Sequence, residues 1–232
     1  MEIAHSLRSL VFGIPFLVFP GRPKERAGVE RLASRKLGAF TVPRLQIDSP
    51  AFADGARIPP RYTADGDNLS PPLRWSGVPA ETRSLVLLVE DPDAPMPKPF
   101  VHWIAMLPPR TAKLREGAPG AALEGRNSSL QVGWIGCRPP RGDVPHHYHF
   151  QLFASSREID VGLNPGRSEI LRQLAGHVIA FGETVGVYGR PRQEAREKES
   201  GPAHAALPRV GANGLRVPEG KITDPQSPEQ AR

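Results

Sequence analysis

Short apolar runs separated by proline, glycine and aspartate turns fill the middle of the chain, and their lengths predict β-strands. The clearest run is SLVLLVE at 84–90, whose apolar character is typical of a strand buried on both faces. FVHWIAML at 100–107 is a second strand, which Pro108 and Pro109 end because proline cannot continue a ladder. Further strands are predicted at 45–47, 58–62, 73–75, 130–134, 146–154 and 183–188.

One helix interrupts the strands near the end of this region. In SEILRQLAGHVIA, Ile170, Leu171 and Leu174 lie on one helical face, and the Ser168 hydroxyl can cap the first turn. Many short strands with one late helix predict an all-β fold with minor helices, specifically an antiparallel β-sandwich.

Three regions differ in composition. Residues 1–44 form a basic N-terminal extension with a short helix predicted at 24–37, residues 45–190 form the domain, and residues 191–232 mix charge with proline and glycine. The last region lacks periodic apolar residues and is predicted to be disordered. The apolar run at 10–19 is too short for the roughly 20 residues that span a bilayer, so no transmembrane segment is expected. A cytoplasmic protein is predicted; the alternative is export, if residues 1–20 act as a signal.

Composition narrows the class of protein. The 27 prolines and 23 glycines among 232 residues favour a loop-rich β protein, and the net charge of +6 favours acidic partners. No basic stripe with interleaved aromatics and no recognition-helix pattern occurs, so nucleic-acid binding is not expected. Cys137 is the single cysteine, which excludes a disulfide framework and a cysteine-based zinc site.

The stretch VPHHYHF concentrates three of the seven histidines at the head of a predicted strand. Alternation along a strand places His147 and His149 on one face, where an i, i+2 pair can coordinate a metal ion. No third ligand with suitable spacing is evident, so no metal site is predicted and two solvated histidines are the alternative.

The opposite face of the same strand carries His146, Tyr148 and Phe150. Polar donors on an apolar wall are unfavourable unless a partner bonds them. Spacing alone leaves two interpretations open, a satisfied core histidine and tyrosine or a pair of ligand donors.

Two rigid loops adjoin these strands. In EDPDAPMPKP, Asp91 precedes a proline and is held extended at the end of the buried strand, with His102 just beyond. A carboxylate beside that histidine would favour its charged form, which can donate to an anion, although a stiff acidic turn is the simpler interpretation. The glycines and Pro-Pro pair of GWIGCRPPRGD allow close backbone approach to a ligand, or form an ordinary turn.

Taken in order, DPDAP, VHW, the Gly/Pro-Pro loop and HxY resemble the phosphatidylethanolamine-binding protein family, and most closely its bacterial Raf-kinase-inhibitor-like, YbhB/YbcL-type branch. SPAFADGARIPPRYTADGDNLSPPLRWSGVP and GHVIAFGETVGVYGR extend the resemblance over residues 45–190. It implies a β-sandwich with a small anion pocket at one end and cis-proline peptides around DPDAP. The implied pocket residues are Asp91, His102, His146 and Tyr148, with Gly136 and Pro139 contributing from the Pro-Pro loop.

One position departs from the family pattern. Arg138 stands directly before the Pro-Pro pair, where a small residue is usual, and Cys137 lies one position earlier. Arg138 points to solvent or adds a guanidinium to the pocket rim, which would favour dianionic ligands.

The resemblance implies a binding protein that needs no cofactor and is not an enzyme. His102 and His146 would donate to phosphate, phosphoethanolamine, a nucleotide or a carboxylate, with the Tyr148 hydroxyl added and Asp91 orienting a histidine. One alternative is a protein-interaction module such as a kinase inhibitor, with a protein partner or a homodimer. The other is a hydrolase whose nucleophile and base are Cys137 and His146, or Asp91 and His102.

Overall fold

The structure, a computed structural model, describes residues 25–117 and 123–192. The apolar run at 10–19, the signal alternative for residues 1–20 and the predicted disorder of residues 193–232 lie outside the described residues. Among those described, no helix is long and apolar enough to cross a membrane.

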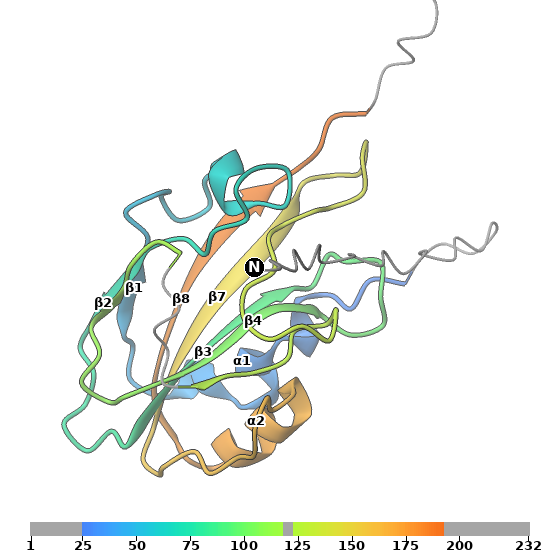
Figure 1. Cartoon of the computed structure of the whole chain (residues 1–232). Coiled ribbons are helices and arrows are strands. Elements are labelled where there is room, and N and C mark those ends of the chain that lie inside the picture. Colours follow the sequence, from blue (N-terminus) through green and yellow to red (C-terminus); the bar gives the residue numbers. More distant parts are fainter. Residues whose placement is uncertain (1–24, 118–122, 193–232) are drawn as a thin grey trace, which may run out of the picture. The chain divides into compact units, whose positions relative to one another are not determined.

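Two antiparallel sheets form the framework, as the predicted β-sandwich requires (Figure 1). The larger sheet has the strand order β6-β4-β3-β7-β8 and the smaller has the order β1-β2-β5. The strands of the larger sheet are β3 (Ser84–Asp91), β4 (Phe100–Leu107), β6 (Leu123–Glu124), β7 (His146–Ser155) and β8 (Val178–Tyr188). Those of the smaller sheet are β1 (Gln46–Asp48), β2 (Leu73–Ser76) and β5 (Lys113–Leu114).

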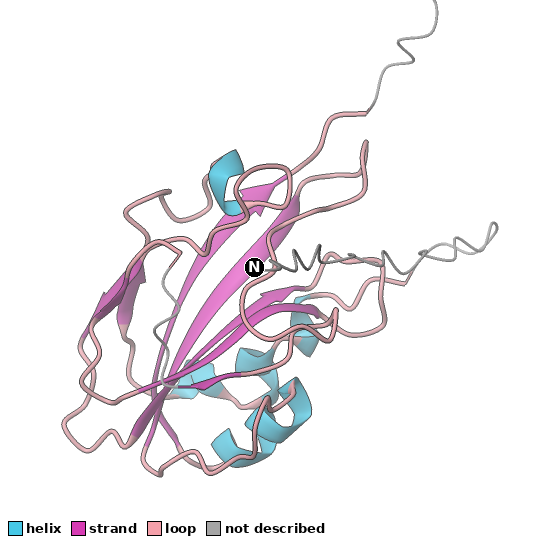
Figure 2. Cartoon of the chain, in the orientation of Figure 1, coloured by secondary structure: helices cyan, strands magenta, loops and turns pink. Residues whose placement is uncertain are grey.

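Both faces of the larger sheet are covered, which explains why all eight residues of β3 are buried. Leu85, Leu87 and Val89 face the small sheet and belong to one apolar cluster. Val86 and Leu88 belong to a second cluster on the other face. Figure 2 shows most of the helices gathered on that second side, away from the small sheet; the 3₁₀ turn Pro60–Tyr62 lies apart from them, and its Tyr62 belongs to the first cluster.

The helices on the second face are short. The longest is α2 (Arg167–Leu174), which buries Ile170 and Leu174 as the sequence predicts. Gly166 occupies its N-cap position with no side-chain cap, so the predicted capping by Ser168 is wrong. Gly176 has a φ of 74°, and the chain then enters β8, so the helix is shorter than the apolar pattern indicates.

The single helix predicted at 24–37 is wrong. Residues there form a 3₁₀ turn at Val29–Arg31 and α1 (Ala33–Lys36), followed by a 3₁₀ turn at Ala39–Thr41. Gly28 and Gly38 both have positive φ, which interrupts a continuous α-helix at each end.

Residues 25–44 nevertheless pack against the large sheet. The Ala33 N–H donates to Glu90 Oε2 at 2.8 Å, and the Ser34 N–H donates to Gln151 Oε1 at 2.9 Å. Arg167 of α2 pairs with the other oxygen of Glu90. The packed structure therefore begins before residue 45, where the sequence placed the start of the domain.

Two predicted strands are wrong, and each has a local cause. Residues 58–62 contain the 3₁₀ turn Pro60–Tyr62, because Pro59 and Pro60 cannot donate to a ladder. Residues 130–134 form a loop in which Leu130 and Gly133 have φ values of 64° and 88°. No cis peptide bond occurs in the described residues, so the cis-prolines implied by the resemblance are absent there.

Candidate functional site

The end of β3 and the starts of β4 and β7 meet at one edge of the large sheet, since β3 lies between two antiparallel neighbours. Asp91 ends β3, and His146 begins β7. Val101 and Trp103 of β4 pair with adjacent residues of β3, so His102 between them is the extra residue of a β-bulge. Bulges of this kind re-aim a side chain, and here the His102 ring lies 5.0 Å from the Tyr148 ring, centroid to centroid.

A cavity of about 540 Å³ opens at this edge. All seven residues named from the sequence line it: Asp91, His102, Gly136, Arg138, Pro139, His146 and Tyr148. Met96, Phe100 and Ile135 add apolar walls. The sequence motifs therefore converge on one cavity, although they are up to 57 positions apart.

Asp91 orients His146 rather than His102. Its Oδ2 lies 2.8 Å from His146 Nδ1, and its Oδ1 accepts the backbone N–H groups of Asp93 and Ala94. The carboxylate is thereby fixed on both oxygens, and the pair is buried. The expected partnership of Asp91 with His102 is wrong.

His146 has a second carboxylate partner. Its Nε2 lies 3.3 Å from Asp143 Oδ2, so both ring nitrogens face carboxylates. Burial disfavours the charged imidazole, but Asp91 and Asp143 outweigh burial and raise the pKa of His146 above its ordinary 6.5. The protonated ring can donate to both carboxylates at once.

His102 has the opposite character. Its Nδ1 lies 2.6 Å from the Ile135 carbonyl oxygen, which assigns the ring proton to Nδ1. Burial lowers the pKa of His102, and the Asp91 charge and the Ile135 carbonyl offset this only in part. The expectation of a charged His102 is therefore wrong, and its Nε2 is left as an acceptor.

The Tyr148 hydroxyl is a buried polar group beside the cavity. The ring of Tyr148 is fully buried, and its hydroxyl makes no hydrogen bond of good geometry to oxygen, nitrogen or sulfur; the Cys137 thiol is the polar group beside it. Burial raises the pKa of Tyr148, so the group is a neutral hydroxyl that can donate. Leaving such a group unpaired costs about 1–3 kcal/mol, and most buried polar groups in proteins are paired.

Arginines border the same cavity. Arg138 is exposed and lines the cavity, which places it at the rim rather than in the interior. Arg190 also lines it and pairs with Asp65 at 2.8 Å. Arg138 therefore adds positive charge at the rim, whereas the charge of Arg190 is balanced by Asp65; His146 and Tyr148 also line the cavity.

The outward histidines of β7 do not form a shared site. His147 Nδ1 lies 2.8 Å from Asp93 Oδ2, and His149 Nδ1 lies 3.1 Å from Glu183 Oε1. Each ring has its own carboxylate, and no metal-competent group of three or more His, Cys, Asp or Glu residues occurs in the described part of the chain.

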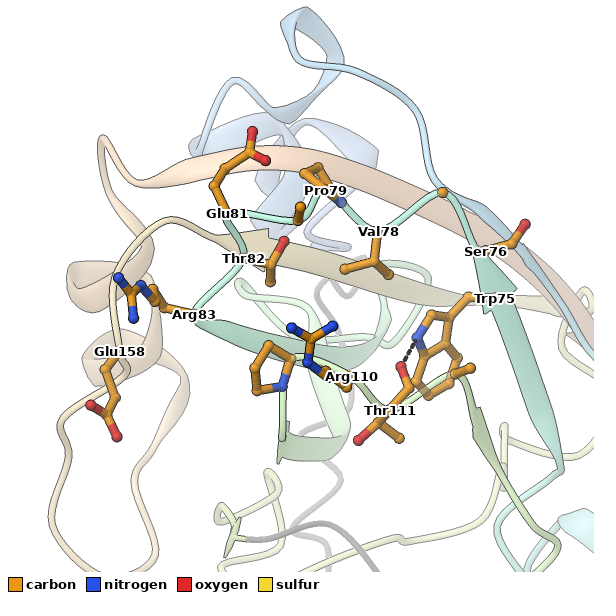
Figure 3. Close-up of a pocket in the computed structure, with 14 residues that line it drawn as sticks. Trp75, Ser76, Val78, Pro79, Glu81, Thr82, Arg83, Arg110, Thr111 and Glu158 are labelled. Carbon is orange, nitrogen blue, oxygen red and sulfur yellow. Dashed lines mark hydrogen bonds between the residues drawn. The ribbon is translucent and has the colours of Figure 1, made fainter.

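A second cavity, of about 840 Å³, lies where β3 begins and β4 ends, at the opposite end of these strands (Figure 3). Arg83 and Arg110 line it together with Glu81 and Glu158, so its charges are balanced. Trp75 Nε1 donates to the Thr111 carbonyl there at 2.7 Å. No histidine or aspartate lines this cavity, so it lacks the titratable side chains that line the cavity at the other end of the strands.

Residues 48–189 match the family model described as phosphatidylethanolamine-binding protein. The chain belongs to this family. The resemblance drawn from the sequence is thereby confirmed, and membership implies a ligand-binding or regulatory role. The phosphatidylethanolamine-binding protein domain includes every residue named above for the cavity except Arg190.

Relatives of the chain occur in archaea and bacteria. It is 39% identical to the UPF0098 protein of Methanothermobacter thermautotrophicus over 153 residues, which are 63% of this chain and 99% of that protein. The UPF0098 protein of Chlamydia trachomatis is 37% identical over 149 residues, with 62% of this chain and 98% of that protein covered. The relatives are therefore not confined to the bacterial branch that the motifs resemble.

Two solved structures share the fold. A phosphatidylethanolamine-binding protein homolog from Chlamydia trachomatis matches with a TM-score of 0.60 and 36% identity, covering 63% of this chain and 98% of that one. Escherichia coli YbcL, described as a member of the mammalian PEBP family, matches with a TM-score of 0.59 and 31% identity over the same shares. The similarity to YbcL agrees with the branch suggested by the sequence.

Sequence reasoning missed Asp143, which lies within the matched phosphatidylethanolamine-binding protein domain, and Arg190, which directly follows it. Asp143 lies three positions before His146 in the quoted loop, and Arg190 is the last residue of GHVIAFGETVGVYGR. Both residues stand in segments quoted from the sequence, but only the folded loops show that Arg190 lines the cavity and that Asp143 contacts His146 from the neighbouring cavity.

Proposed function

We propose that the chain binds a small anion, namely phosphate or the phosphate group of a headgroup such as phosphoethanolamine, in the cavity at the end of β3. The observation that carries the proposal is the Tyr148 hydroxyl, which is buried beside the cavity without a partner. A ligand oxygen that accepts from this hydroxyl removes the penalty of leaving it unpaired.

The chemistry of the cavity suits a phosphate oxyanion. Tyr148 supplies a neutral donor, His146 a cationic ring, and His102 an acceptor for a protonated phosphate oxygen. Arg138 places positive charge at the rim, where it attracts anions and is screened by salt.

Binding rather than catalysis is part of the proposal. Cys137 was one nucleophile considered for a hydrolase, and it is fully buried. Burial raises the pKa of the Cys137 thiol well above its usual value, which keeps it protonated and weakly nucleophilic. This environment favours a structural thiol over a catalytic one.

Tyr148→Phe tests the proposal because it removes only the unpaired hydroxyl. We expect phosphate and phosphoethanolamine binding, measured by isothermal titration calorimetry, to weaken by about 1–3 kcal/mol. The free energy of unfolding should stay equal or rise, since no existing hydrogen bond is lost.

Tyr62→Phe is the matched control. The Tyr62 hydroxyl donates to Glu116 at 2.7 Å and does not line the cavity, so its loss should leave phosphate affinity unchanged. Equal affinities of the wild-type and Tyr148→Phe proteins for both ligands would reject the assignment.

A further inference from the structure

A segment outside the family domain reaches the candidate site. Arg26 precedes the matched residues 48–189, yet its guanidinium Nη2 donates to Asp143 Oδ1 at 2.7 Å. The other oxygen of Asp143 faces His146 Nε2. Asp143 therefore connects Arg26 of the N-terminal segment to His146, which lines the cavity.

The position of Arg26 is set by contacts on both sides of it. The Gly28 N–H donates to the Pro92 carbonyl at 3.1 Å, and Arg31 Nη1 donates to the Pro97 carbonyl at 2.5 Å. Pro92 and Pro97 belong to the loop that follows Asp91. The segment thus lies along the loop that forms one border of the site.

Asp143 already makes with His146 the kind of contact that an anionic ligand would make, because a carboxylate oxygen faces the ring nitrogen. It offers a carboxylate oxygen to Nε2, while Asp91 holds Nδ1, so neither ring N–H of His146 is free. Asp143 is itself held by Arg26 and by the Val144 N–H at 2.9 Å. An incoming oxyanion must compete with this carboxylate for the ring, and also meets its negative charge.

We propose that Asp143, which lines the neighbouring cavity and not the anion cavity itself, competes with the anionic ligand for His146 and that Arg26 holds it in place, so that a ligand must displace Asp143 from His146 before it binds fully. The proposal rests on the anion-binding function proposed above. It makes the segment at 25–31 a determinant of affinity, although that segment lies outside the family domain.

Asp143→Asn and Arg26→Gln, made singly and together in the full chain, test the proposal with inorganic phosphate. At pH 5.5, where His146 stays cationic in both proteins, Asp143→Asn should raise the affinity about three- to tenfold, because a competing charged hydrogen bond is removed. Arg26→Gln should raise it by a smaller factor, of about two, since Asp143 loses its anchor. In the Asp143→Asn background, Arg26→Gln should give no further increase.

Asp48→Asn is the matched control, because Asp48 forms an exposed pair with Arg74 at 2.7 Å and lies outside the cavity. It removes the same charge and should leave phosphate affinity unchanged. Unchanged or weaker phosphate binding by Asp143→Asn would overturn the proposal. An equal change on Arg26→Gln in both backgrounds would overturn the part assigned to the segment.

The NMR titration of His146 gives a readout that needs no ligand. Asp143→Asn should lower the pKa of His146, because Asp143 is one of the groups that raise it. An unchanged titration would overturn the contact. A lowered His146 pKa with no phosphate binding by either protein would support the contact and contradict the anion-binding function instead.

Discussion

At the scale of single residues, the two histidines of the site differ in charge because their partners differ. His146 lies between two carboxylates, whereas His102 is bonded to a backbone carbonyl. Both rings are almost fully buried, so burial alone cannot explain the difference. The neighbouring carboxylates decide which ring is cationic.

The raised pKa of His146 predicts how Asp91 contributes to stability with pH. A histidine whose folded pKa exceeds its unfolded value of 6.5 adds stability that is complete below pH 6.5 and is lost as pH rises through the folded pKa. Asp91→Asn should therefore lower the free energy of unfolding by about 1–3 kcal/mol at pH 5.5, on the scale of a charged hydrogen bond. Urea unfolding at pH 5.5 and 8.5 should show a smaller deficit at the higher pH; a deficit independent of pH would contradict the assignment.

The sequence predicted which residues meet at the site better than it predicted their pairing. The family resemblance implied one pocket for Asp91, His102, His146 and Tyr148, strand alternation put His146 and Tyr148 on one face, and all four line one cavity in the structure. Alternation cannot predict the bulge at His102, because the bulge depends on pairing with β3. It also cannot show that the Asp143 side chain turns back toward His146.

At the scale of elements, buried polar residues connect the N-terminal segment to the sheet. Glu90 is fully buried and accepts from Ala33, Gln151 and Arg167. The sequence predicted the strand that carries Glu90, since its apolar run is continuous. It could not predict the partners, because Ala33 and Ser34 contact the sheet through backbone N–H groups, which leave no side-chain pattern in the sequence.

Glu90→Ala should therefore destabilise the protein strongly. It leaves Arg167 and the Ala33 N–H without their acceptor, and breaking a buried pair costs about 3–5 kcal/mol. Chemical denaturation should show this loss, while Asp48→Ala, which breaks the exposed pair with Arg74, should cost no more than about 1 kcal/mol. Similar losses for the two variants would show that Glu90 does not anchor the segment.

At the scale of the whole described region, different elements pack over the apolar clusters on the two faces of the large sheet. The small sheet covers one face, and α2 with the N-terminal segment covers the other. The run of apolar residues in β3 predicted burial on both faces, and the structure confirms it. What the sequence could not predict is how closely the covering chain approaches, because that distance depends on residues far apart in the chain.

Gly186 of β8 marks such an approach. A Cβ atom there would lie 2.4 Å from Cγ1 and 2.6 Å from Cδ1 of Ile58, which is fully buried and has little room to move. Gly186→Ala should therefore destabilise the protein by about 1–3 kcal/mol through overpacking. Gly162→Ala is the control: a Cβ there meets nothing within 4 Å, so the free energy of unfolding should stay within about 0.5 kcal/mol or rise slightly. If both variants unfold at the same denaturant concentration, the covering chain moves aside at Ile58, and the spacing between the layers is set elsewhere.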